Sequence, residues 1–104
     1  MSTVHVIAVI ITNPGIREKV LQIFNDNVPA VHAESGCIEY LATIDTASVG
    51  DLQTKFGENT FVVIEKWESL DALMAHATSS HMQQYGAKTK NMIAKRTIHV
   101  LSPT

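Results

Sequence analysis

The residue types best suited to acid–base chemistry are concentrated between Phe61 and His81. In this stretch Glu65 and Trp67 precede His76 and His81. An imidazole titrates near neutral pH, so either histidine is a candidate general base that removes a proton from a substrate. A base of this kind is commonly oriented by a third group, and Glu65 is the candidate for that role.

Glu65 lies in the middle of a predicted strand. Residues of like parity share a strand face, so Phe61, Val63, Glu65 and Trp67 line one side of it. A carboxylate among apolar side chains is costly to bury unless it is paired, and a downstream histidine or an arginine could be its partner, for catalysis or for structure alone.

The two histidines lie five residues apart across a predicted helix break, so helical spacing does not bring His76 and His81 together. A hydrogen-bonded structural histidine is the alternative for both. For His81 a surface position is a further alternative.

A second group of residues is suited to holding a flat, apolar substrate. Trp67 could form a wall on which an aromatic ring stacks, or it could be a core residue. Tyr40 and Tyr85 could donate hydrogen bonds to oxygens of such a substrate, or be half-buried core residues. The candidate substrate-binding residues are Trp67, Tyr40, Met82, Tyr85 and Val63.

No metal site is predicted. Cys37 is the only cysteine, so neither an internal disulfide nor a four-thiolate zinc site can form. No cationic neighbour is evident that would activate Cys37, which favours an inert thiol. The five histidines lack the spacing of a metal-binding motif.

The bulk composition predicts one globular domain covering residues 1–104. The chain is 45% hydrophobic and only 17% charged, which favours self-association because apolar surface remains to be covered. A net charge of −2 argues against nucleic-acid or membrane-surface binding. The N-terminus lacks the pattern of a signal peptide, and the apolar run 4–11 is too short to span a bilayer, so a cytoplasmic protein is expected.

The elements follow the order β-α-β-β-α-β, which predicts an α+β, ferredoxin-like fold with an antiparallel sheet. Asn13 and Pro14 are expected to begin the first helix, and Pro29 to kink it or end it early. The connection 45–60 is either an extension of its flanking strands into a long hairpin or a lid over a site. Strands are expected at 4–11, 37–44, 61–68 and 97–101, with helical patterns at 16–31, 70–77 and 82–93.

Several short motifs occur in order along almost the whole chain. They are the NPG turn after the first strand, VPAVHAESGCIEY at 28–40, IEKWES at 64–69, ALMAH at 72–76, SSHMQQY at 79–85 and IHVLSP at 98–103. In these motifs the chain resembles the antibiotic-biosynthesis monooxygenase superfamily, and within it the small bacterial quinol monooxygenases. Members that form polyketide quinones carry an asparagine at the place of Val63, so the resemblance is weaker there.

The resemblance implies a homodimer in which two sheets pack face to face as a dimeric α+β barrel. It also implies dioxygen chemistry without flavin, haem or metal on a hydroquinone-type aromatic. The favoured hypothesis is therefore a cofactor-independent quinol monooxygenase or oxidase, in which His76 or His81, supported by Glu65, deprotonates the quinol before electron transfer to dioxygen. The alternatives are a non-catalytic, stress-associated dimer that binds quinones or another small apolar ligand, and an isomerase of a small carbonyl compound.

Overall fold

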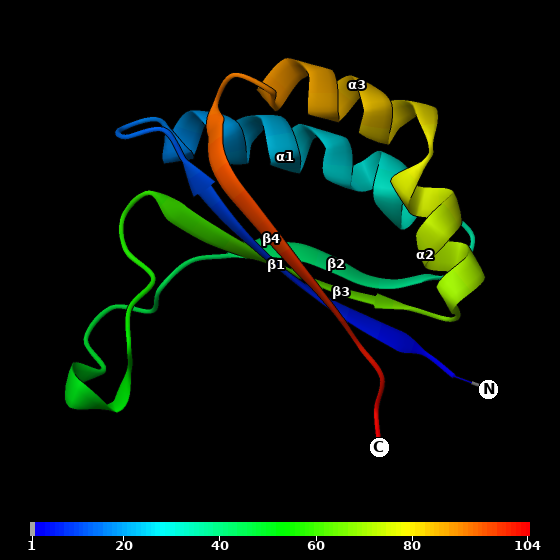
Figure 1. Ribbon diagram of the computed structural model, residues 1–104, viewed down its shortest axis with the longest axis horizontal. Helices are drawn as coiled ribbons and strands as arrows, with labels where there is room; N and C mark the ends of the chain where they lie inside the picture. The colour runs from blue at the N-terminus through cyan, green and yellow to red at the C-terminus, as the bar shows by residue number, and fades with distance from the viewer. Residues whose placement is uncertain (1) are drawn as a thin grey trace.

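A four-stranded antiparallel sheet with helices on one face forms the protein (Figure 1). The structure, a computed structural model, describes residues 2–104. The strands are β1 (Val4–Thr12), β2 (Cys37–Thr43), β3 (Thr60–Trp67) and β4 (Ile93–Leu101), in the order β2-β3-β1-β4. The helices are α1 (Arg17–His32), α2 (Leu70–Ala77) and α3 (Ser80–Thr89), with a short 3-10 turn η1 (Gly50–Leu52). This arrangement confirms the predicted ferredoxin-like fold.

The central strands carry the apolar residues that fill the space beneath the helices. The inward side of β3 is buried along its length, as its alternation predicted. Val6 of β1 pairs with Glu65, and Val4 pairs with Trp67, so the acid and the indole lie on the covered face, near the end of β3 that leads to α2. Helix α1 contributes Phe24 to this core, where the Phe24 ring stacks on the ring of Tyr40.

Helix α1 begins three residues later than predicted, at Arg17. Gly15 has a positive φ of 80°, and Asn13 donates its side-chain amide to the carbonyl of Asn91 at 2.8 Å rather than capping the helix. Asn13 to Gly15 therefore form a turn that ties the start of α1 to the turn before β4. The helix also runs past Pro29 to His32, so the predicted early end is wrong.

The last strand is longer than predicted because α3 ends at Thr89. The N–H of Met92 closes a turn on the Thr89 carbonyl at 2.8 Å, and the chain enters β4 at Ile93. The expectation that Met92 and Ile93 continue the helix is therefore wrong. Ile93 instead pairs with Thr12, and β4 continues along β1 to the pair of Leu101 with His5.

The connection between β2 and β3 is not an extended hairpin, since β2 ends at Thr43 and β3 begins at Thr60. It projects beyond the end of the sheet (Figure 1). The Asp45 carboxylate holds it by accepting the backbone N–H groups of Phe56 and Gly57 at 3.1 and 2.9 Å.

The other face of the sheet carries no helix (Figure 1). Apolar side chains form a strip across it, with Ile7, Val9 and Ile11 of β1, Ile64 of β3 and Leu41 of β2, and polar residues such as Lys66, Thr97 and His99 flank this strip. Leu41 is 41% exposed and Ile11 is 36% exposed. Among residues 2–104, no helix combines the length and hydrophobicity needed to cross a bilayer.

Candidate active site

The break between α2 and α3 determines where the two histidines lie. Ser69 caps α2 as predicted, because its hydroxyl accepts the backbone N–H of Ala72 at 3.1 Å. The helix ends at Ala77, and the hydroxyl of Ser79 donates to the carbonyl of His76 at 2.8 Å. His76 is therefore in the last turn of α2, and His81 is in the first turn of α3.

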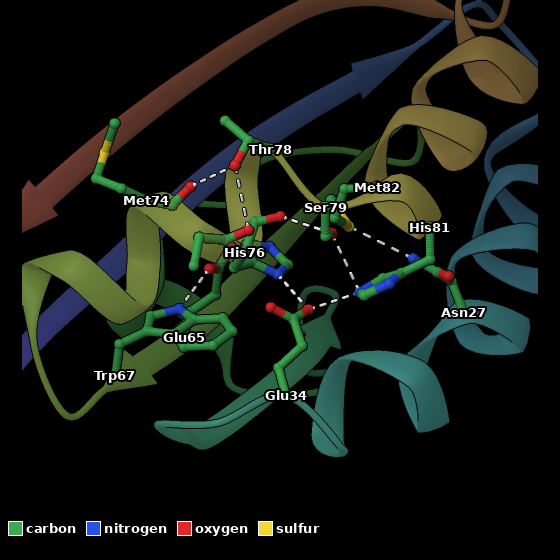
Figure 2. Close-up of polar contacts among 11 residues, drawn as sticks. Asn27, Glu34, Glu65, Trp67, Met74, His76, Thr78, Ser79, His81 and Met82 are labelled. Carbon is green, nitrogen blue, oxygen red and sulfur yellow. Dashed lines mark hydrogen bonds and ion pairs between the residues drawn. The ribbon is translucent and has the colours of Figure 1, made fainter.

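One carboxylate oxygen joins these histidines (Figure 2). Oε2 of Glu34 lies 2.8 Å from Nδ1 of His76 and 2.7 Å from Nε2 of His81. An ionised carboxylate only accepts hydrogen bonds, so with Glu34 ionised both of these nitrogens carry a proton and donate it. The two histidines that sequence spacing kept apart are thus brought together, by a residue that sequence reasoning missed.

Glu34 reaches the histidines because the turn between α1 and β2 lies directly against α2. Gly36 in that turn has a φ of +86°, and a Cβ at this position would lie 2.6 Å from Cβ of Ala72. The Gly36 carbonyl also accepts the backbone N–H of Glu68 at 2.8 Å. A glycine here therefore permits both the backbone conformation and the close approach that place Glu34 beside His76.

Trp67 and Glu65 form a buried pair behind His76, which agrees with the core alternative for Trp67 and gives Glu65 a partner other than the expected histidine or arginine. The Trp67 indole N–H donates to Oε1 of Glu65 at 2.9 Å, so the direct partner of Glu65 is this indole and not a histidine. Burial raises the pKa of Glu65, while the Trp67 hydrogen bond and the nearby His76 oppose the rise. The carboxylate that contacts the histidines is Glu34.

Trp67 is completely buried and does not line the cavity next to it. Its ring lies against the His76 imidazole, with centroids 4.6 Å apart and planes inclined by 36°. The indole thus supports the histidine instead of presenting a wall to a substrate.

A cavity of about 340 Å³ lies between the sheet and helices α2 and α3. His76 and Glu65 line it, and so do four of the five predicted substrate-binding residues: Tyr40, Val63, Met82 and Tyr85. Most of its other lining residues are apolar. No residue of the 45–60 connection lines it, so the prediction of a lid over this site is wrong.

The mouth of the cavity lies between α2 and β4. The lining residues Met74, Ile98 and Val100 are each more than half exposed, at 55%, 56% and 51%. Arg96, Ile98 and Val100 of β4, which line the cavity on this side, are all exposed. A ligand therefore has access to the apolar interior from this edge.

Two tyrosines of the cavity lining, Tyr40 and Tyr85, carry hydroxyls that are candidate hydrogen-bond donors to a ligand. Burial raises the pKa of Tyr85 to about 12, against the opposing effect of Arg96. Burial, reinforced by Glu65, also raises the pKa of Tyr40 well above its ordinary value. Both phenols are therefore protonated at neutral pH and available as donors.

His81 does not line this cavity. It contributes instead to a separate pocket of about 130 Å³ between α1 and α3, together with Asp26 and Lys88. Its side chain is 26% exposed, against 5% for His76. Of the two candidate bases, only His76 can meet a ligand in the larger cavity.

Glu34, His76 and His81 are also a possible ligand set for a divalent cation. Among residues 2–104 they form the one such group, with ligand atoms within 4.8 Å of one another. Their contacts, however, are those of a hydrogen-bonded triad, since a single oxygen receives both imidazoles at hydrogen-bonding distance. Cys37 is not suited to bind metal or attack a substrate, because burial, Glu34 and Glu65 all raise the pKa of its thiol.

Comparison with known proteins agrees with the fold and the motifs. Residues 3–88 match the family described as antibiotic biosynthesis monooxygenase. A relative named "Probable quinol monooxygenase YgiN", from Escherichia coli (strain K12), is 37% identical over 100 residues, which cover 94% of this chain and 95% of the relative.

Solved structures show the same fold. PA3566 from Pseudomonas aeruginosa superimposes with a TM-score of 0.81 at 22% identity, covering 100% of this chain and 96% of that one. Rv0793 from Mycobacterium tuberculosis gives a TM-score of 0.80 at 24% identity, covering 99% and 96%. Because the family match spans most of the chain and a relative is similar over nearly its full length, the chain belongs to the antibiotic biosynthesis monooxygenase family.

Proposed function

We propose that the protein is a quinol monooxygenase or oxidase in which His76, held by Glu34, deprotonates a hydroquinone in the 340 Å³ cavity. The observation that carries the proposal is the pairing of a cavity-lining imidazole with a half-buried carboxylate, that of Glu34. The name of the Escherichia coli relative supports the choice of a quinol.

The role of base follows from which nitrogen of His76 is free. Nδ1 donates to Glu34, and Nε2 has no hydrogen-bond partner among the described residues. In the neutral ring the proton then lies on Nδ1, so the lone pair of Nε2 can accept a phenolic proton. The imidazolium that forms is stabilised by the Glu34 carboxylate.

Deprotonation is the activating step because a phenolate anion gives an electron to dioxygen far more readily than a neutral phenol does. In the monooxygenase reaction, one quinol and one dioxygen give one hydroxylated quinone and one water. The quinol then supplies all four electrons that reduce dioxygen, and one oxygen atom enters the ring. In the oxidase reaction the same pair gives the quinone and hydrogen peroxide, and the quinol supplies two electrons.

The remaining polar groups of the cavity would orient the ring. Oε2 of Glu65 has no hydrogen-bond partner among the described residues, and it is available to a second hydroxyl of the substrate. Tyr40 and Tyr85 would donate to quinol or quinone oxygens. Val63 and Met82 would cover the apolar ring and exclude water from the reaction.

The lining favours an aromatic substrate over a sugar phosphate. Arg96 is the one cation among the described lining residues, and it is exposed, whereas the other lining side chains are mostly apolar. A site for a phosphorylated sugar would need several cationic or polar groups. A cavity of this size and character is typical of sites for small apolar ligands.

We also propose that the helix-free face of the sheet is the homodimer interface. Its apolar side chains, Ile7, Val9, Ile11, Leu41 and Ile64, would be covered by the same face of a second copy. Sedimentation should give twice the monomer mass of 11.4 kDa. A Val9→Lys variant should sediment as a monomer, and a monomeric wild type would contradict this interface.

The activity is tested with a menadiol-type quinol that is prepared without oxygen and then aerated. The protein should accelerate oxygen consumption above the uncatalysed rate. With dioxygen labelled with the heavy isotope of oxygen, label in the quinone product identifies the monooxygenase reaction, and unlabelled quinone with labelled peroxide identifies the oxidase. An unchanged rate together with tight quinone binding would instead favour the non-catalytic binding protein.

A further inference from the structure

We propose that His81 is a positioning residue that acts through Glu34 to keep the His76 imidazole in the tautomer with its proton on Nδ1. The catalytic consequence of this role rests on the proposed function of His76 as base, whereas its effect on the His76 tautomer does not. The role accounts for a contact that the reaction itself does not use, the 2.7 Å bond between His81 and Glu34.

His81 acts at a distance from any ligand. Its ring lines the small outer pocket between α1 and α3, and it is absent from the lining of the large cavity. Figure 2 shows its imidazole on the opposite side of Glu34 from Glu65 and Trp67. A substrate in the large cavity therefore meets His76 while His81 stays behind the carboxylate.

The shared oxygen makes the two histidines depend on each other. Oε2 of Glu34 is held from two sides, by His76 of α2 and by His81 of α3. With only the His76 bond, the Glu34 side chain, which is 13% exposed, would be free to rotate toward water. A second N–H donor on the same oxygen removes that freedom and keeps the acceptor facing Nδ1 of His76.

The orientation of His81 is itself fixed by the helix junction. Nε2 of His81 lies 3.2 Å from Oγ of Ser79, and the Ser79 hydroxyl donates to the His76 carbonyl. The N–H of His81 can therefore form a bifurcated hydrogen bond, with Oε2 of Glu34 and Oγ of Ser79 as its two acceptors. The break between α2 and α3 thus places both imidazoles against the Glu34 carboxylate and the Ser79 hydroxyl against His81.

The consequence of losing His81 concerns the free nitrogen of His76. If Glu34 no longer holds Nδ1–H, a neutral His76 also populates the tautomer with its proton on Nε2, which cannot accept a proton from a substrate. A displaced Glu34 also stabilises the imidazolium less well, and one hydrogen bond to a charged group corresponds to a roughly ten- to hundredfold effect. His81→Ala should therefore lower kcat by about that factor and leave KM within about twofold.

His81→Gln separates positioning from titration. The glutamine amide offers an N–H donor near the place of Nε2 but has no ionisable ring, so it should recover most of the lost kcat. Gln84→Ala, on the same helix and in the same outer pocket, is the matched control and should behave as the wild type. A glutamine variant as slow as the alanine variant would overturn the proposal.

The tautomer is measured directly by proton–nitrogen correlation spectra of the histidine rings, without any substrate. Near pH 8, where an ordinary histidine is neutral, the wild-type His76 should show its proton on Nδ1. His81→Ala should shift His76 toward a mixture of tautomers, and His81→Gln should not. If His76 keeps one tautomer in the folded His81→Ala variant, the proposed role of His81 fails even if quinol oxidation is confirmed. If no quinol is oxidised, the proposed function fails, and these spectra still decide the role of His81.

Discussion

Oε2 of Glu34 lies 2.8 Å from Nδ1 of His76, although the two residues are 42 positions apart in the sequence. The contact exists because the turn after α1 passes close to α2, with Gly36 directly against Ala72. The acid–base residues expected between Phe61 and His81 therefore depend on a second segment of the chain, the turn that carries Glu34. The geometry of Glu34 and His76 is therefore coupled to the packing of that turn.

Gly36→Ala tests this coupling. The substitution places a Cβ 2.6 Å from Cβ of Ala72 and puts a side chain on a residue with φ of +86°. It should lower the free energy of unfolding by about 2 kcal/mol or more, which urea titration measures, and it should slow quinol oxidation by displacing Glu34.

Gly15→Ala is the matched control for that variant. Gly15 also has a positive φ, of 80°, but a Cβ there meets nothing within 4 Å. The free energy of unfolding of Gly15→Ala should fall by only about 1–2 kcal/mol, and the variant should keep its activity. Equal losses of stability and activity in the two variants would show that the approach of Gly36 to Ala72 does not matter.

Glu65→Gln should not destabilise the protein at neutral pH. Because burial raises the pKa of Glu65, the folded state prefers the protonated acid. The stability that this group contributes is present below its ordinary value of 4.5 and is lost as the pH rises through the folded-state pKa. Glutamine keeps an oxygen for the Trp67 N–H and carries no charge at any pH.

The comparison is made by thermal unfolding at several pH values. Relative to the wild type, Glu65→Gln should be as stable or more stable at pH 7, and this difference should shrink below about pH 4.5. Glu68→Gln, at an exposed position just after the strand, should show no such pattern. A variant that is clearly less stable at pH 7 would mean that the Glu65 charge is stabilising.

Asp45→Asn should show the opposite pH dependence. The backbone N–H groups of Gly57 and Phe56 lower the pKa of Asp45, so its contribution is present above its ordinary value of 3.8 and is lost as the pH falls through the folded-state pKa. The variant should be less stable than the wild type at pH 7, and the difference should shrink as the pH falls below the ordinary value of 3.8. Asp51→Asn, in the same connection, serves as the control; a constant difference across this range would argue against the two backbone hydrogen bonds.

The parts of the site that follow local rules could be predicted from the sequence. Alternation places Glu65 and Trp67 on the covered face of β3, and a serine before an apolar helical pattern caps α2 at Ser69. The polar run after Ala77 separates α2 from α3. Each of these depends on residues within a few positions of one another.

The parts that depend on distant segments could not be predicted in the same way. Glu34 is one of several glutamates outside the strands, and nothing local marks it as the partner of His76. The nearest sequence feature that could indicate this contact is Gly36, whose positive φ allows the close turn beside Glu34. For Trp67, full burial behind His76 results from helix packing that strand periodicity does not specify.

The role of His76 as the base is tested most directly by one measurement. The initial rate of quinol-dependent oxygen consumption is compared for the wild type, His76→Asn, and His32→Asn on the exposed side of α1. Asparagine keeps an N–H donor near the place of Nδ1 but cannot take a proton, so His76→Asn should be slower by about 10²–10⁴-fold while it still binds quinol, and His32→Asn should match the wild type. A folded His76→Asn protein that oxidises quinol within about threefold of the wild-type rate would contradict the assignment.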